Sequence, residues 1–196
     1  MNLANKITLA RVILVPVFII LIMASQIPGL AGLVADGTIS QNVLNWCALA
    51  VFIIASMTDF LDGYIARKYN MISNFGKFMD PLADKLLVCS ALICLLALGR
   101  INVFLVLIII ARDFIISGFR LVASDKGVVI AANMWGKVKT TMQMVMIGFM
   151  IPNLPLFHWI CVILSWVVLF LTVYSLMDYL IRNCGVLKDE NNFYIK

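Results

Sequence analysis

The stretch Val43–Tyr64, with the sequence VLNWCALAVFIIASMTDFLDGY, decides the fold class of the chain. Residues 43–58 contain no charged side chain, and Asp59 and Asp62 follow directly. A helix needs about 20 predominantly apolar residues to cross the hydrocarbon core of a bilayer. The stretch therefore predicts a transmembrane helix whose end is acidic.

Comparable apolar stretches occur along the rest of the chain. Of its 196 residues, 63% are hydrophobic and the mean hydropathy is +1.04, whereas soluble domains are about 45–50% apolar. A chain of this length cannot bury so much apolar surface in a core. We predict an all-α, polytopic membrane protein, residues 1–196 forming one membrane domain, with a short N-terminal amphipathic helix over Leu3–Arg11. Its six transmembrane helices are predicted over residues 12–35, 43–64, 82–98, 103–121, 135–151 and 156–181.

Positive charge indicates how these helices are oriented. The chain has fifteen Lys and Arg residues, and only Arg100 falls in the connections that six spans would place on the opposite side from the termini. Under the positive-inside rule both termini face the cytosol, while residues 36–42 and the Pro152–Pro155 turn face outward. The formal net charge of +5 then belongs to the cytosolic face, where it would meet anionic lipids or phosphate-bearing substrates.

Four aspartates lie close together at this predicted cytosolic face. Asp59 and Asp62 are three residues apart at the end of the second span, and Asp80 and Asp84 are four apart at the start of the third. Residues at these spacings share one side of a helix. Because the connection is short, we expect the two helices to be antiparallel neighbours with both pairs facing one point.

Four ionised carboxylates at a membrane edge would repel one another at a cost of several kcal/mol. Protonation is one way to avoid this cost, and a divalent metal is another, since Mg²⁺, Mn²⁺ and Ca²⁺ prefer hard oxygen ligands. Gly63 and Ala66 beside the aspartates leave room for a ligand, which favours the metal. A third way is interfacial salt bridges with the neighbouring basic residues, which are Arg67, Lys68, Lys77 and Lys85.

The acidic region has the pattern D-x-x-D-G-x-x-A-R-x(8)-G-x-x-x-D-x-x-x-D, which runs without a gap from Asp59 to Asp84. This pattern resembles the signature of the CDP-alcohol phosphatidyltransferases. The resemblance extends to the six predicted spans, the cytosolic termini and the position of the signature between spans two and three. Members of this family transfer a phosphatidyl group from a CDP-linked lipid to an alcohol and release CMP.

The resemblance implies a role for each aspartate. Asp59, Asp62, Asp80 and Asp84 would bind Mg²⁺ or Mn²⁺ in a two-metal site, where the metal would neutralise charge on the leaving CMP. Asp84 resembles the catalytic general base, and a carboxylate crowded by others has the raised proton affinity that suits this role.

The resemblance also implies binding residues and partners. CDP-diacylglycerol is the expected donor, and Ser73 stands where the family often has Thr, which keeps the hydroxyl. We expect a homodimer among membrane lipids, in the cytoplasmic membrane of a bacterium, with several spans, a cytosolic active site and no nucleic-acid partner. The residues that would contact the CDP-lipid are Thr8, Asp62, Gly63, Arg67, Ser73 and Asp80.

Basic residues near spans four and five suggest a site for a phosphorylated acceptor, because Arg binds phosphate through two parallel hydrogen bonds. The same charges could instead only set topology and anchor the helix ends. The candidate acceptor-phosphate residues are Arg112, Arg120, Lys137 and Lys139.

Three stretches, Asn5–Pro16, Ala111–Phe114 and Gly136–Thr140, resemble bacterial family members that use glycerol 3-phosphate as the acceptor. Inositol phosphate, serine and phosphatidylglycerol remain alternative acceptors. A membrane cation transporter is an alternative of a different class, but transporters bind ions near the bilayer midplane. Here every acidic residue except Asp36 falls near the predicted cytosolic edge. At the end of the last span, Asp178 and Arg182 are expected to form a local ion pair.

Overall fold

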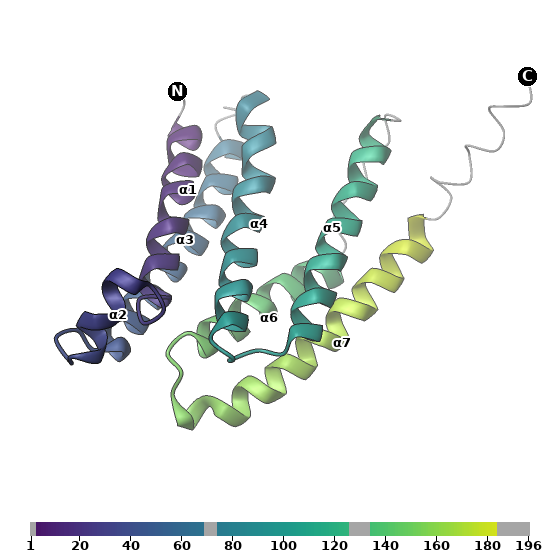
Figure 1. Ribbon diagram of the computed structural model, residues 1–196. Coiled ribbons are helices and arrows are strands. Elements are labelled where there is room, and N and C mark those ends of the chain that lie inside the picture. Colours follow the sequence, from purple (N-terminus) through teal and green to yellow (C-terminus); the bar gives the residue numbers. More distant parts are fainter. Residues whose placement is uncertain (1–2, 69–73, 126–133, 184–196) are drawn as a thin grey trace, which may run out of the picture. The chain divides into compact units, whose positions relative to one another are not determined.

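The computed structural model describes the backbone of residues 3–68, 74–125 and 134–183, and the side chains of residues 11–58, 85–123 and 134–183. Over these ranges the regular secondary structure is helical, with no strand, which confirms the predicted all-α class (Figure 1). The helices are α1 (Leu3–Ile22), α2 (Pro28–Ala35), α3 (Gln41–Lys68), α4 (Asn74–Ala97), α5 (Val103–Asp125), α6 (Met134–Met150), the 3-10 turn η1 (Pro155–Phe157) and α7 (His158–Asn183).

The chain forms two compact units. The first contains residues 1–101 and 147–158, and the second contains residues 102–146 and 159–196. The signature aspartates belong to the first unit, and the predicted acceptor-phosphate residues belong to the second.

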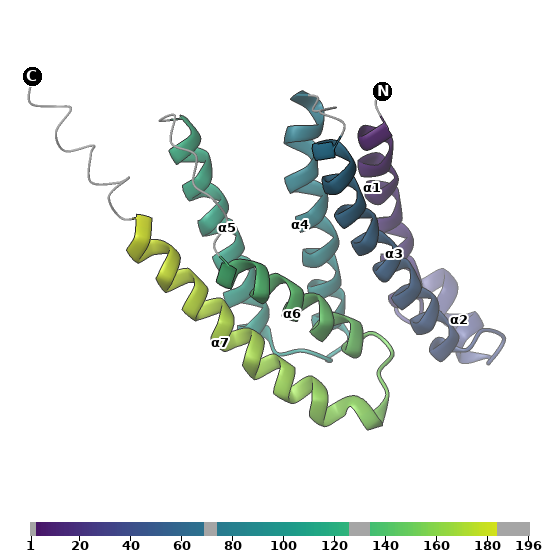
Figure 2. The same cartoon turned by 180° about the vertical axis from the view of Figure 1, so that it is seen from behind.

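In the first unit, α1 packs along both α3 and α4, whereas α3 and α4 contact each other much less. Figures 1 and 2 show the three helices side by side, with α3 and α4 running in opposite directions. Phe18 of α1 and Phe52 of α3 meet with ring centroids 6.0 Å apart, and both side chains are buried. The buried residues Ala48 and Ala55, one turn either side of Phe52, let the helix backbones approach closely.

The prediction that residues 12–35 form one helix is wrong. Helix α1 ends at Ile22, and α2 begins only at Pro28. Pro28 has no backbone N–H and disfavours a helical conformation for the preceding residue, and Ile27 is accordingly extended, with φ −82° and ψ 119°. At the other end, Leu3–Arg11 does not form a separate amphipathic helix but continues without interruption into the apolar part of α1.

Arg100, the basic residue expected on the outer face, links two parts of the first unit. Gly99 ends α4 with a φ of 68°, and the backbone N–H of Arg100 donates to the carbonyl of Leu95 over 2.9 Å, as in a Schellman motif. The Arg100 Nη1 donates to the carbonyl of Ile151 over 2.6 Å. This bond satisfies a carbonyl just after the end of α6, and burial lowers the pKa of the guanidinium.

In the second unit, aromatic side chains connect α7 to its neighbours. Tyr179 packs edge-on against Phe119 of α5 with centroids 5.8 Å apart, and Tyr174 packs edge-on against Trp135 of α6 at 5.0 Å. The predicted ion pair at the end of this helix is confirmed, because Arg182 Nε lies 2.7 Å from Asp178 Oδ1.

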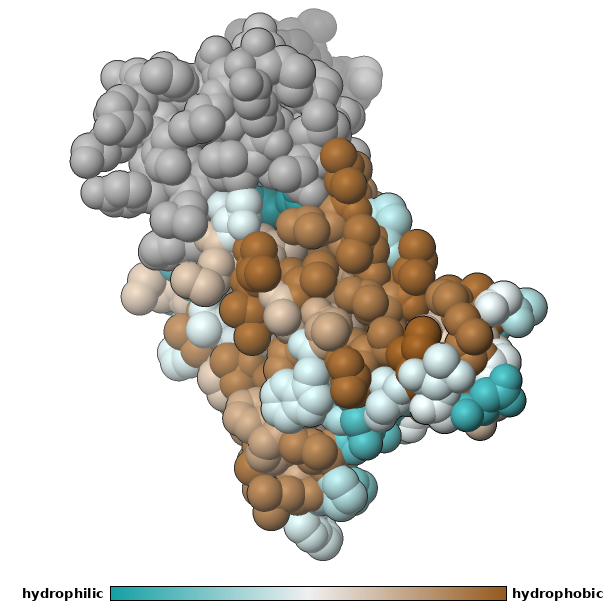
Figure 3. Space-filling view, turned by 90° about the vertical axis from the view of Figure 1, so that its left-hand side faces the viewer, coloured by the Kyte–Doolittle hydropathy of each residue, from teal (hydrophilic) through white to brown (hydrophobic). Residues whose placement is uncertain are grey.

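Two helical segments, Gln41–Thr58 and Pro155–Asn183, are long and apolar enough to cross a membrane, and Arg11–Ile22 and Lys85–Ala97 are shorter apolar helices. Large apolar side chains are exposed on α7, such as Trp159 at 74% and Trp166 at 69%. Figure 3 shows an apolar surface over much of the first unit, with polar side chains gathered towards the end at which α2 lies in Figure 1. Exposed apolar surface of this extent fits a membrane protein, while the six-span topology stays a prediction.

We expect Phe18→Ala to destabilise the first unit by about 3–5 kcal/mol, because it leaves a cavity between α1 and α3. Ile20→Ala on the same helix is the matched control, since Ile20 is 49% exposed and its truncation opens no cavity. The free energy of unfolding, measured by denaturant titration in detergent micelles, distinguishes the two variants. Equal losses for both would contradict the packing described here.

Candidate active site

Each pair of signature aspartates lies on a single helix. Asp59 and Asp62 are in α3, which continues to Lys68, and Asp80 and Asp84 are in α4, which begins at Asn74. Both helices extend beyond the apolar stretches from which they were predicted, so the signature is helical over residues 59–68 and 74–84. Residues 69–73 lie outside the described residues. Spacings of three and four in a helix put the two carboxylates of each pair on one side.

The remaining signature positions are less fully described. Thr8 is in α1, and Gly63 and Arg67 are in α3, but the side chains of Thr8, Arg67 and the four aspartates lie outside those that the structure describes. Ser73 lies outside the described residues altogether. Among the described side chains no group of three or more His, Cys, Asp or Glu could hold a metal ion, so the metal site over α3 and α4 stays a prediction.

Arg11 places a buried cation on α1, the helix that packs against both signature-bearing helices, α3 and α4. It lies on α1 with 1% of its surface exposed, on the same side as the buried Val15 and Phe18. A guanidinium is buried only where its charge is compensated. The side of α1 that packs against α3 and α4 is therefore polar near its start and apolar further along.

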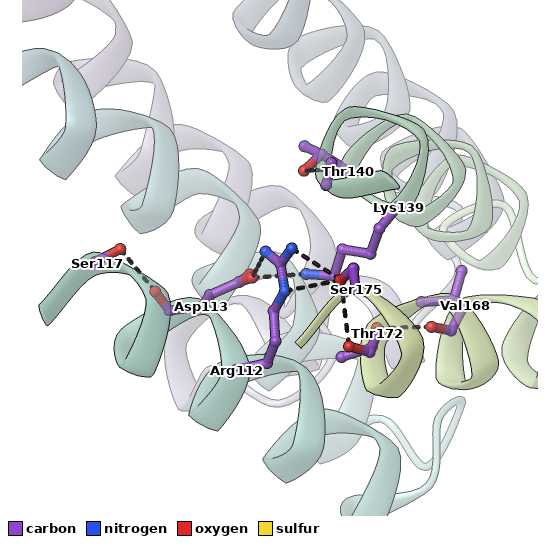
Figure 4. A network of polar contacts seen from close by, with 9 residues as sticks. Arg112, Asp113, Ser117, Lys139, Thr140, Val168, Thr172 and Ser175 are labelled. Carbon is purple, nitrogen blue, oxygen red and sulfur yellow. Dashed lines mark hydrogen bonds and ion pairs between the residues drawn. The ribbon is translucent and has the colours of Figure 1, made fainter. Parts of the chain in front are cut away.

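The second unit contains a buried polar network around Arg112 of α5 (Figure 4). The Arg112 Nη1 donates to Asp113 Oδ1 over 2.9 Å, while Nε and Nη2 donate to Ser175 Oγ of α7 over 3.2 and 2.9 Å. Arg112 and Ser175 are both buried. The guanidinium is thus held on two sides, by a carboxylate and by a neutral hydroxyl.

Lys139 of α6 joins the same network. Its Nζ donates to Asp113 Oδ1 over 2.7 Å, and only 1% of the residue is exposed. One carboxylate therefore pairs with two cations, Arg112 and Lys139.

Hydrogen bonds from two serines and a close backbone approach hold the network in place. Ser117 Oγ donates to the Asp113 carbonyl over 2.7 Å, and Ser175 Oγ donates to the Thr172 carbonyl over 3.3 Å. A Cβ added to Gly136 of α6 would lie 3.3 Å from Arg112 Nη2, tighter than an ordinary van der Waals contact. The lack of a side chain at this position lets the α6 backbone approach the guanidinium.

The four predicted acceptor-phosphate residues therefore fall into two classes. Arg112 and Lys139 are buried and joined through Asp113, whereas Arg120 and Lys137 are exposed. The Arg120 Cζ lies 5.9 Å from the centroid of the Tyr179 ring, close enough for a cation–π contact. The structure brings the first pair together and does not describe a contact that joins the second pair to it.

Sequence reasoning assigned no role to two buried polar residues of this unit. Ser175 has no local motif that marks it, because its partner Arg112 is distant in the chain. Gln143 lies one turn after Lys139 on the buried side of α6, and its Nε2 has no hydrogen-bond partner among the described residues. A charged residue and a glutamine one turn apart inside an apolar segment could have predicted that this side of α6 is a buried polar face.

The chain matches known proteins along most of its length. The family model described as CDP-alcohol phosphatidyltransferase matches residues 1–174. A protein of Bacillus subtilis named CDP-diacylglycerol–glycerol-3-phosphate 3-phosphatidyltransferase is 45% identical, with 97% of this chain and 99% of the relative aligned. A Rickettsia typhi protein of the same name is 33% identical over 91% of this chain and 94% of its own. A Mycobacterium tuberculosis protein named probable phosphatidylglycerophosphate synthase is 36% identical over 92% and 81%. The family model covers the aspartate signature together with Arg112, Asp113 and Lys139, and the chain belongs to the CDP-alcohol phosphatidyltransferase family.

Proposed function

We propose that the chain transfers a phosphatidyl group from CDP-diacylglycerol to sn-glycerol 3-phosphate, giving phosphatidylglycerophosphate and CMP. The observation that carries this proposal is the 45% identity, over nearly the whole of both chains, to a relative named for that reaction. The full aspartate signature on α3 and α4 supplies the residues that the chemistry requires.

The donor half of the site is proposed at the aspartates. Four carboxylates on two adjacent helices form a donor set of the kind that Mg²⁺ or Mn²⁺ prefers, and Asp59, Asp62, Asp80 and Asp84 would hold two such ions. Bound metal would supply charge neutralisation at the pyrophosphate of the CDP-lipid. Thr8, Gly63, Arg67 and Ser73 would contact the same substrate, together with Asp62 and Asp80.

In the transfer step, the acceptor hydroxyl oxygen forms a bond to the phosphatidyl phosphorus. The bond from that phosphorus to the bridging oxygen of CMP breaks, and CMP leaves with the electron pair. Asp84 takes the proton from the acceptor hydroxyl as the general base. The remaining residues bind and orient the two substrates.

The acceptor half is proposed in the second unit. Arg112 and Lys139 are two buried cations that share Asp113, and exposed Arg120 and Lys137 add two further cations from α5 and α6. Glycerol 3-phosphate and inositol phosphate each carry a phosphate that such a site would bind, whereas serine does not. The names of the relatives favour glycerol 3-phosphate.

The setting that we propose is the cytoplasmic membrane of a bacterium, with several spans, the active site at the cytosolic face and a homodimer as the assembled form. The apolar helices and their exposed side chains support a membrane location. The concentration of Lys and Arg on one side of the predicted topology supports the orientation.

Purified chain in detergent, given CDP-diacylglycerol, Mg²⁺ and radiolabelled glycerol 3-phosphate, is expected to release CMP as label enters the lipid. Asp84→Asn is expected to lower kcat by about 10²–10⁴-fold, because the substituted amide cannot accept the proton. EDTA is expected to abolish the reaction. Asp36→Asn, which changes an exposed aspartate outside the signature, is the matched control and should keep the wild-type rate.

Failure of wild-type protein to release CMP with glycerol 3-phosphate would refute the proposed reaction. Release of CMP only with inositol phosphate, serine or phosphatidylglycerol would retain the family chemistry and change the acceptor. Full activity of Asp84→Asn would remove Asp84 from the role of general base.

Arg120→Ala and Lys137→Ala are each expected to raise the KM for glycerol 3-phosphate about tenfold, the effect of losing about 1.4 kcal/mol of phosphate binding. The KM for CDP-diacylglycerol should stay at the wild-type value. Arg182→Ala is the matched control, because Arg182 is an exposed arginine of the same unit that pairs with Asp178. An unchanged KM in both variants would mean that Arg120 and Lys137 serve only to set topology.

A further inference from the structure

Ser175 contributes the only neutral side chain among the described residues that hydrogen-bonds directly to the Arg112 guanidinium. Its Oγ accepts from Nε over 3.2 Å and from Nη2 over 2.9 Å, and the residue is 2% exposed. The same Oγ donates to the Thr172 carbonyl over 3.3 Å, which aims its lone pairs at Arg112. The hydroxyl is thus anchored on α7 and contacts one whole edge of the guanidinium (Figure 4).

The hydrogen bonds around Arg112 leave part of the guanidinium available. A guanidinium has five N–H groups in a fixed plane. The three hydrogen bonds to Asp113 and Ser175 use three of them, so two remain, one on Nη1 and one on Nη2. Since the group is planar and held along two edges, the direction of these two N–H groups is determined by Ser175 and Asp113 together.

Ser175 is uncharged, and this affects whether Arg112 keeps its positive charge. A carboxylate at this position would neutralise Arg112, whereas a hydroxyl orients it and leaves its positive charge in place. Asp113, the carboxylate that pairs with Arg112 among the described residues, is already shared with Lys139. Ser175 therefore fixes the geometry of a buried cation without adding a negative charge, as a phosphate-binding arginine requires.

We propose that Ser175 is a positioning residue for the acceptor substrate, which acts by holding Arg112 in the orientation that binds the phosphate of glycerol 3-phosphate. This inference rests on the proposed function and on the acceptor site around Arg112. Gly136 assists from the opposite helix, because its missing Cβ lets α6 lie against Nη2. Ser175 itself does not contact the substrate.

A double-mutant cycle tests the proposal. Wild type, Ser175→Ala, Arg112→Ala and the double variant are compared for KM of both substrates and for equilibrium binding of radiolabelled glycerol 3-phosphate in EDTA, where no turnover occurs. Ser175→Ala is expected to raise the KM and Kd for glycerol 3-phosphate about tenfold and to leave the KM for CDP-diacylglycerol unchanged. In the Arg112→Ala background the same substitution should add nothing, because Ser175 acts only through Arg112.

Ser165→Ala is the matched control. Ser165 is a partly buried serine on the same helix whose Oγ donates only to the Cys161 carbonyl over 2.7 Å, so its loss should change neither KM. A variant that folds less completely lowers the number of binding sites but not the Kd of the folded fraction, so binding separates positioning from loss of structure.

Several results would overturn the proposal. A tenfold effect of Ser175→Ala that persists in the Arg112→Ala background would mean that Ser175 acts independently of Arg112. Equal increases in both KM values would indicate a general structural role. If the wild type is active with glycerol 3-phosphate and Ser175→Ala leaves the KM and Kd for this substrate unchanged, this inference alone is refuted. If the wild type has no activity with glycerol 3-phosphate, the proposed function is refuted.

Discussion

The packing of α1 against both α3 and α4 is the contact on which the rest of the first unit depends. The two signature-bearing helices touch each other little, and the buried side of α1 holds them together through residues such as Val15 and Phe18. Small residues on α3 allow the close approach. The relative position of the two aspartate pairs is therefore set largely by a helix that contributes none of the four aspartates. Substitutions in α1 far from the signature should therefore change the relative position of the two aspartate pairs.

The second unit depends instead on how its buried positive charges are compensated. Arg112 and Lys139 are both buried, and burial of an uncompensated charge is costly. Asp113 accepts hydrogen bonds from both, and Ser175 and the close approach of Gly136 complete the surroundings of Arg112. This arrangement satisfies much of the hydrogen-bonding capacity of the cations.

Family membership and site geometry support the proposed reaction in complementary ways. The aspartate signature, read residue by residue, indicates the chemistry of phosphatidyl transfer, and the match over residues 1–174 assigns the chain to the family. The acceptor site that we propose lies in the second unit, where Arg112 and Lys139 form a buried network with Asp113. A transporter would need an ion site reached from both sides of the bilayer, and the predicted topology instead places the aspartate pairs near the cytosolic edge.

The sequence by itself determined the helical class and the approximate bounds of α5, α6 and α7, because an apolar run and a helix coincide there. It also predicted the Asp178–Arg182 pair, since residues four apart in a helix are always neighbours. It did not reveal the break between Ile22 and Pro28, where the apolar run continues although α1 has ended and α2 has not begun. Nor did it reveal that α3 extends to Lys68 and that α4 begins as early as Asn74. Only the tertiary structure decided that Ser175 holds Arg112 and that Asp113 is shared with Lys139, because these partners lie on three different helices and no local spacing connects them.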